Sequence, residues 1–204
     1  MKVIANLVLM LSLSFSVFSQ NGDINLLRKI NGSYTPSGGN FFQFITDTDD
    51  PVTFGFPGVL IVKGLITKNK TDLWNSTEML STSLVSSLMV FGFKSTIKRD
   101  RPFITYPDIV KHTHGGSYSM PSGHTSICFA TATAVSLIYP KWYVIAPMYT
   151  WASLVGYSRM YLGVHYPTDV LAGAIVGSGT AVGTHYLFKY IKKKVEQKKT
   201  PEKL

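Results

Sequence analysis

Apolar residues gather into five long segments of the chain, at 52–66, 79–93, 125–139, 143–157 and 170–188. The segments are rich in Ala, Gly, Ser and Leu, and they lack the strict alternation of apolar and polar residues that is typical of half-buried strands. We therefore expect five helices and no sheet. The stretch at 21–50 mixes short amphipathic sequence with residues rich in Gly, Ser and Pro, and we expect a turn or two of helix and a loop there.

These segments fit either a membrane or a soluble core. Several are shorter than the roughly 17–25 residues that cross a bilayer, and Ser and Thr are frequent in them, which favours a soluble bundle. The loops favour the membrane, because "TKNKTD", "YPKWY" and the lysine-rich C-terminus would share the cytoplasmic side. The basic stretch 94–111 would lie on the other side and needs a separate explanation. We favour a transmembrane bundle and keep the soluble one as the alternative.

The first twenty residues, "MKVIANLVLMLSLSFSVFSQ", have a basic start, an apolar run, and Val17 and Ser19 shortly before Gln20. This pattern is typical of a secretory signal peptide, and an uncleaved anchor helix is the alternative. We therefore divide the chain into a signal peptide or anchor at 1–20, a helical domain at 21–190 and a basic tail at 191–204.

Composition excludes a disordered chain, because 45% of the 204 residues are hydrophobic and only 15% are charged. Lys and Arg number 20 against 11 Asp and Glu, and much of the net charge of +9 lies at 94–111 and near the C-terminus. We find no nucleic-acid recognition motif near the tail. Anionic lipid or a phosphate is therefore the expected partner of these cations, and nucleic acid is not.

Three polar motifs stand at the ends of the apolar segments. They are "KSTIKRDRP" at 94–102, "PSGH" at 121–124 and "SRMYLGVHYPTD" at 158–169. Successive helices alternate in direction, so the three motifs should meet at one end of the bundle. They would bring three cations, two histidines, a tight turn and a carboxylate together.

The first expected task of this end is to bind a phosphate. The turn at Ser122 and Gly123 precedes a helix, whose first N–H groups form a ready anion site. The Ser122 hydroxyl can add a hydrogen bond, and Gly123 lets an anion approach the backbone closely. Lys94, Arg101 and Arg159 would neutralise the phosphate oxygens as charge builds up on them.

The second expected task is phosphoryl transfer to a histidine. His165 would attack phosphorus, while Asp169 would hold its other ring nitrogen and fix the tautomer. His124 would protonate the leaving oxygen and would then activate the water that releases phosphate. The sequence thus predicts a hydrolase that works through a phosphohistidine.

Together the motifs resemble the three signature motifs of the type 2 phosphatidic acid phosphatase family, which shares its fold with the vanadium-dependent haloperoxidases. Each motif alone is weak, but three in this order and spacing are specific. The resemblance implies an all-α helical bundle and a metal-independent phosphatase. The matching residues are Lys94, Arg101 and Pro102 in the first motif, Pro121, Ser122, Gly123 and His124 in the second, and Ser158, Arg159, His165 and Asp169 in the third.

No group of His, Asp and Glu in the sequence has the spacing of metal ligands, so we expect no metal and no cofactor. His112 and His114, in "KHTHGG", are alternative zinc ligands that we interpret as loop residues near the site. His185 lies in the last apolar segment, and we interpret it as a packed residue.

We therefore expect an enzyme of a bacterial inner membrane that hydrolyses lipid phosphates or pyrophosphates on the periplasmic side. Candidate substrates are undecaprenyl pyrophosphate, phosphatidylglycerol phosphate, phosphatidic acid and a lipid A phosphate. The alternatives are a soluble, secreted, non-specific acid phosphatase of the periplasm, a vanadium haloperoxidase and a non-catalytic bundle. The sequence leaves the choice of lipid and the oligomeric state open.

Overall fold

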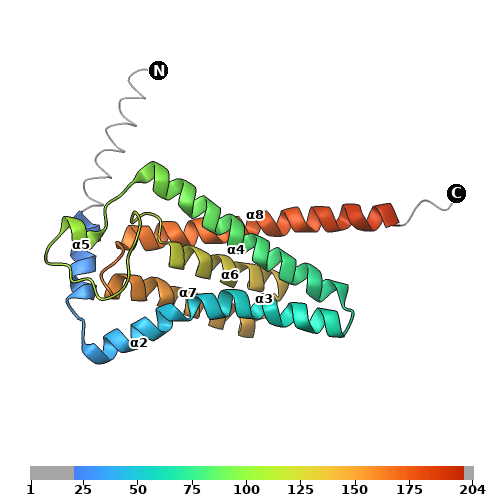
Figure 1. Cartoon of the computed structure of the whole chain (residues 1–204), viewed down its shortest axis with the longest axis horizontal. Helices are drawn as coiled ribbons and strands as arrows, with labels where there is room; N and C mark the ends of the chain where they lie inside the picture. Colours follow the sequence, from blue (N-terminus) through green and yellow to red (C-terminus); the bar gives the residue numbers. More distant parts are fainter. Residues whose placement is uncertain (1–20, 200–204) are drawn as a thin grey trace, which may run out of the picture.

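The fold is a bundle of helices, seen here in a computed structural model that describes residues 21–199. The expected signal peptide or anchor at 1–20 and the last residues of the expected tail, 200–204, lie outside the described residues. The all-α prediction is confirmed, since no strand occurs between 21 and 199. A helical segment at 21–31 is followed by α2 (Pro36–Asp47), α3 (Asp49–Ile66), α4 (Lys70–Ile97), α5 (Pro102–Thr105), α6 (Gly123–Ile138), α7 (Trp142–Tyr161) and α8 (Pro167–Lys199) (Figure 1).

The five expected helices are confirmed as α3, α4, α6, α7 and α8, and α4 and α8 extend furthest beyond their apolar segments. Helix α4 has 28 residues, and its start is capped by Asn69, whose side chain accepts a hydrogen bond from the Thr71 N–H at 2.9 Å. Helix α8 has 33 residues and continues through 191–199, the first part of the expected tail. Lys, Glu and Gln, which have good helix propensity, extend α8 past its apolar pattern, whereas mixed polar and apolar residues extend α4.

Within 21–50, where we expected a turn or two of helix and a loop rich in Gly, Ser and Pro, residues Pro36–Asp47 form helix α2, so this part of the prediction was wrong. Thr35 caps the helix by accepting a hydrogen bond from Gly38 N–H at 3.1 Å, and Pro36 occupies the first turn. Helix α2 packs against α7. The two glycines of "PSGGN" suit this packing, because a side chain at Gly38 would meet the Tyr161 hydroxyl and one at Gly39 would meet the Tyr34 ring.

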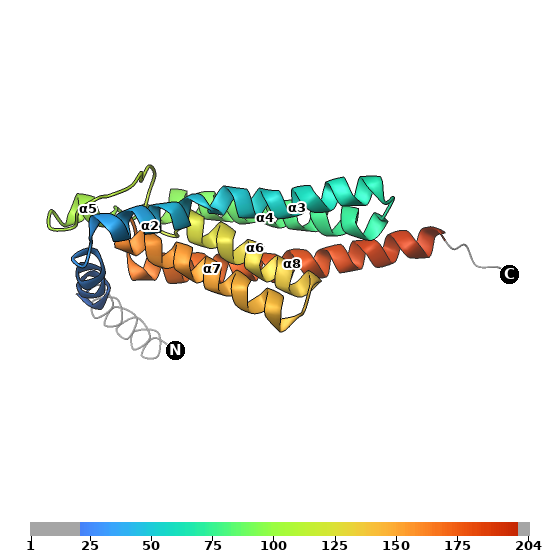
Figure 2. The same cartoon turned by 90° about the horizontal axis from the view of Figure 1, so that it is seen from below.

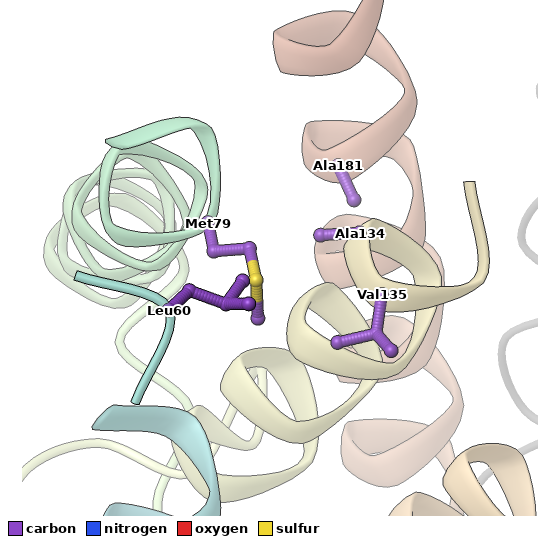
Figure 3. Close-up of a cluster of buried hydrophobic side chains, with 5 residues drawn as sticks. All are labelled: Leu60, Met79, Ala134, Val135 and Ala181. Atoms are coloured by element: carbon purple, nitrogen blue, oxygen red, sulfur yellow. The ribbon is translucent and has the colours of Figure 1, made fainter. Parts of the chain in front are cut away.

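Helix α6 lies at the centre of the bundle and packs against α4, α7 and α8 (Figure 2). One cluster of its core joins four helices through Leu60, Met79, Ala134, Val135 and Ala181 (Figure 3). Small residues let α6 and α8 approach each other closely. A Cβ at Gly177 of α8 would collide with the Ser126 carbonyl oxygen of α6, so glycine is required at this position.

Two helical stretches, Lys70–Thr105 and Pro167–Gln197, are long and apolar enough to cross a membrane. Only 22% of the most apolar window of each is buried within the bundle, so both helices present large apolar side chains outward. Leu88 and Phe91 on α4 and Leu171 and Ile175 on α8 are exposed in this way. An apolar outer surface of this extent suits lipid better than water.

The ends of the helices bring the three polar motifs to one end of the bundle. The C-terminal ends of α4 and α7 and the N-terminal ends of α6 and α8 meet there, beside α5 (Figures 1 and 2). The turns between α3 and α4 and between α6 and α7 lie toward the other end, together with the C-terminal part of α8. The alternating directions expected from the sequence are therefore observed.

Candidate active site

The centre of the polar end is a buried pair formed by His165 and Asp169. His165 lies in the loop between α7 and α8, and Asp169 lies in the first turn of α8. The His165 Nδ1 atom is 3.3 Å from Asp169 Oδ2, and both side chains are almost completely buried. Gly163 makes the turn before His165 with a φ of +75°, which favours glycine.

Burial is the main cause that lowers the pKa of His165 to about 4, and the positive charges of Arg101 and Arg159 add to it. The carboxylate of Asp169 acts in the opposite direction. His165 is therefore a neutral imidazole near pH 7. With Nδ1–H donated to Asp169, the lone pair lies on Nε2, which is 3.4 Å from Arg101 Nη1.

Asp169 is held by donors on every side. It accepts hydrogen bonds from the Tyr166 N–H at 2.9 Å, from the Ser119 hydroxyl and from Arg99 Nη1 at 2.8 Å. A carboxylate with this many donors stays ionised and keeps a fixed orientation. The arrangement therefore fixes the position and the tautomer of His165.

Arg99 and Asp23 form an outer layer that the sequence prediction missed. Arg99 donates from Nη2 to Asp23 Oδ2 at 2.7 Å, and its guanidinium lies 3.8 Å from the centre of the Tyr166 ring. Asp23 also accepts from the N–H and the hydroxyl of Thr168, at 2.9 and 2.5 Å. The helical segment at 21–31 is thereby tied to the start of α8, directly behind Asp169.

The three predicted cations all lie at this end of the bundle. The Lys94 ammonium donates to the Tyr118 carbonyl. Arg101 donates from Nε to the Ser117 carbonyl at 2.7 Å and from Nη1 to the Val164 carbonyl at 2.9 Å. These backbone contacts hold the side chains in place and leave their positive charge without a paired carboxylate among the described salt bridges.

The surroundings of Arg159 indicate a site for an anion. It is 3% exposed, and it donates from Nη1 to the Thr46 hydroxyl at 2.9 Å and from Nη2 to the His114 carbonyl at 3.1 Å. Its Nε atom is buried and has no hydrogen-bond partner among the described residues. Buried donors are rarely left unpaired, so this N–H is available to a ligand oxygen.

The "PSGH" turn provides the start of α6, with Ser122 as the N-cap and Gly123 as the first helical residue. Ser122 makes no capping bond, which leaves N–H groups of the first turn free for an anion. The Ser122 N–H itself donates to the Asp169 carbonyl at 3.0 Å, and the Ser122 hydroxyl accepts from Thr125 at 2.9 Å. Ser122 thus has a larger part in joining α6 to α8 than the sequence suggested.

His124 lies one residue further along α6, at the wall of a cavity of about 340 Å³ between α3, α4 and α6. Its Nε2 atom is 3.4 Å from Asp49 Oδ2 at the start of α3. His124 is thus the most accessible of the predicted site histidines, since 43% of its side chain is exposed while His165 is buried.

The other three histidines contact residues outside the predicted catalytic pair. The His112 ring stacks on Tyr34 with ring centres 3.5 Å apart, and the His114 carbonyl accepts from Arg159. His185 Nδ1 is 2.8 Å from Glu78 Oε1, toward the other end of the bundle. Within residues 21–199, no group of three or more His, Cys, Asp or Glu side chains is arranged to hold a metal ion.

The predicted residues are therefore close together, and several others join them. Those that the sequence analysis missed are Asp23, Thr46, Asp49, Arg99 and Ser119. Arg99 alone gave a signal, as a second arginine in the first motif. The others come from stretches without a motif and reach the site only through folding.

Comparisons with known proteins point to one family. The profile of the PAP2 superfamily matches residues 76–193. An undecaprenyl-diphosphatase of Sulfolobus acidocaldarius is 43% identical over 112 residues, which are 52% of this chain and 54% of that protein. A lipid A 4'-phosphatase of Porphyromonas gingivalis is 34% identical over 116 residues, which are 54% of this chain and 48% of that protein. The chain thus spans about half the length of these relatives.

A solved structure has the same fold over nearly the whole chain. It is the crystal structure of a transmembrane PAP2-type phosphatidylglycerolphosphate phosphatase from Bacillus subtilis. The TM-score is 0.70 at 24% sequence identity, and the match covers 94% of this chain and 96% of the other. The residues that match the family profile, 76–193, contain all three polar motifs.

Proposed function

The chain belongs to the PAP2 superfamily, and from that premise we propose that it hydrolyses phosphate or pyrophosphate esters of lipids through a phosphohistidine at His165. The relatives are named for phosphatases of lipid substrates, which supports the reaction class. The observation that carries the proposal is the unpartnered Nε of Arg159, a buried donor beside a neutral histidine and two further cations. A phosphate is the group that satisfies all of them.

In the proposed first step, the lone pair of His165 Nε2 attacks phosphorus, and the bond from phosphorus to the leaving oxygen breaks. Asp169 retains the Nδ1 proton and stabilises the positive charge that forms on the ring. Lys94, Arg101 and Arg159 stabilise the charge on the equatorial oxygens. His124 gives its proton to the leaving oxygen.

In the second step, His124 removes a proton from a water molecule, whose oxygen attacks phosphorus and breaks the bond to Nε2. Inorganic phosphate leaves, and both histidines return to their starting states. Two single displacements at phosphorus need no redox chemistry and no bound group beyond the side chains named.

We also propose that the bundle crosses a bacterial inner membrane with this site on the periplasmic side. The two long apolar helices and their outward apolar faces support a membrane location. Lysines gather toward the opposite end, which supports a cytoplasmic position for that end. They are Lys63, Lys68, Lys70, Lys141, Lys189, Lys192, Lys193 and Lys194.

The test is phosphate release by the protein purified in detergent, from a panel of polyprenyl pyrophosphate, phosphatidic acid, phosphatidylglycerol phosphate and lipid A. We expect turnover of at least one lipid and none by the His165→Ala variant. Activity on small monoesters alone, by a protein released from cells without detergent, would support the soluble acid phosphatase instead. Oxidation of bromide with vanadate and peroxide would support the haloperoxidase.

A further inference from the structure

Asp49 is a carboxylate outside the three motifs that faces one of the two site histidines. It is the first residue of α3, and its Oδ2 atom is 3.4 Å from His124 Nε2. The other carboxylate oxygen, Oδ1, accepts a hydrogen bond from the Asp50 N–H at 2.7 Å. This bond fixes the carboxylate, of which 14% is exposed, so that its second oxygen stays directed at His124.

The charged groups around His124 indicate why the contact with Asp49 matters. His124 lies within electrostatic range of His165, Arg101, Arg159 and Lys94, all of which are positive or become positive during the reaction. Asp49 is the carboxylate that pairs with His124 among the described salt bridges. A proton on His124 therefore depends on Asp49 for stabilisation, apart from the negative charge that the substrate itself brings.

The pair also faces the space from which a leaving group can depart. Asp49, Gly123 and His124 line the cavity of about 340 Å³ between α3, α4 and α6. His165 is buried and does not line this cavity, so we place the nucleophile on the inner side of a phosphate at the start of α6 and the cavity on its outer side. The alcohol of the ester would then pass His124 on its way out.

On the basis of the proposed phosphatase reaction, we propose that Asp49 is the positioning residue of His124. Asp49 accepts the proton on Nε2 and thereby directs Nδ1 and its proton at the leaving oxygen. As the ester bond breaks, its electron pair goes to that oxygen, which takes the proton from Nδ1. Neutral His124, still oriented by Asp49, then takes a proton from the attacking water.

The choice of leaving group separates this role from a structural one. An alkoxide, as in a lipid phosphate, is a poor leaving group and needs a proton while the bond breaks. A nitrophenolate is stable as an anion and needs little help. A defect in general acid catalysis therefore slows the lipid ester far more than the aryl ester, whereas a loss of folded protein slows both equally.

The experiment compares kcat/KM, which reports only the steps up to departure of the leaving group, for dioctanoyl phosphatidic acid and for p-nitrophenyl phosphate in detergent solution. For Asp49→Asn we expect a loss of about 10- to 100-fold on the lipid and less than about threefold on the aryl ester. Asp47→Asn is the matched control, because Asp47 is exposed in the same "DTDD" stretch and its side chain bonds to Gln43 instead. Both of its rates should match the wild type.

A double variant strengthens the test. If Asp49 acts through His124, then Asp49→Asn added to His124→Ala should cause no further loss on the lipid ester. Equal losses on both esters, or a double variant much slower than His124→Ala, would overturn the proposed role. A wild-type protein that releases phosphate from neither ester would instead overturn the phosphatase function.

Discussion

Replacement of Asp169 by Asn tests how the buried carboxylate prepares His165. The change keeps the size of the side chain but removes its charge and one acceptor oxygen. In the wild type, Oδ2 accepts from His165, Tyr166 and Ser119, and Oδ1 accepts from Arg99, so an amide NH₂ in either position faces at least one donor. An NH₂ in the Oδ2 position would donate to Nδ1, which moves the ring proton to Nε2 and blocks the attacking lone pair.

The expected loss of kcat is about 10³- to 10⁴-fold, the range for a carboxylate that fixes a histidine tautomer, and corresponds to about 4–5.5 kcal/mol of transition-state stabilisation. The cost in folding free energy should be smaller. Loss of one partner of a buried ion pair costs about 3–5 kcal/mol, but Arg99 is 24% exposed and keeps Asp23, so we expect about 1–3 kcal/mol.

The assay is phosphate release from the preferred lipid, with a thermal melt of the same detergent-solubilised sample. Asp108→Asn is the control, because it removes a carboxylate from an exposed pair with Arg28 that bonds to neither His165 nor Asp169, and it should change neither quantity. A kcat for Asp169→Asn within about tenfold of the wild type, in a folded protein, would refute the tautomer argument.

Three further predictions concern the metal, the pH dependence and the topology. Vanadate should inhibit, because it mimics a five-coordinate phosphorus, and EDTA should not; activity lost in EDTA and restored by zinc would point to His112 and His114. Burial lowers the pKa of His165 to about 4, so the neutral imidazole is present above that pH and is lost only as the pH falls through it. With p-nitrophenyl phosphate, whose leaving group needs little help from His124, formation of the covalent intermediate in single-turnover quenching should therefore not decline from about pH 7 to 5, whereas a decline centred near about 6.5 would contradict this. A cysteine at Ser117 should react with an impermeant thiol reagent in intact spheroplasts and one at Lys70 should not, with the buried Cys128 as the silent background; the reverse labelling would contradict the proposed orientation.

Much of the fold can be predicted from the sequence, because helices are indicated by local patterns of apolar residues. The five apolar segments have no competing strand pattern, and alternating helix directions suffice to bring the three motifs to one end. The error at 36–47 is also local in origin. Two glycines made "PSGGN" resemble a loop, although Thr35 and Pro36 form a good helix start. Packing on α7, which the local sequence does not reveal, decides between the two.

Most of the site residues that could be predicted from the sequence belong to the three motifs. His165 and Asp169 are four residues apart, so their contact follows from a helix start. Ser119 contacts Asp169 across 50 residues of sequence, and Arg99 bonds to Asp23 across 76. Asp49 meets His124 only because α3 and α6 begin at the same level of the bundle. Such contacts depend on tertiary structure and leave no periodic signal in the chain.

The central claim is a covalent bond between phosphorus and His165, and its direct test is to trap that bond. The wild-type protein would be mixed with a lipid phosphate carrying ³²P and quenched within milliseconds in base, because a phosphorus–nitrogen bond is lost in acid. Peptide mass spectrometry should find the label on His165, and the His165→Ala variant should carry none and release no phosphate. A label on another residue, or turnover by His165→Ala at a rate near that of the wild type, would contradict the mechanism.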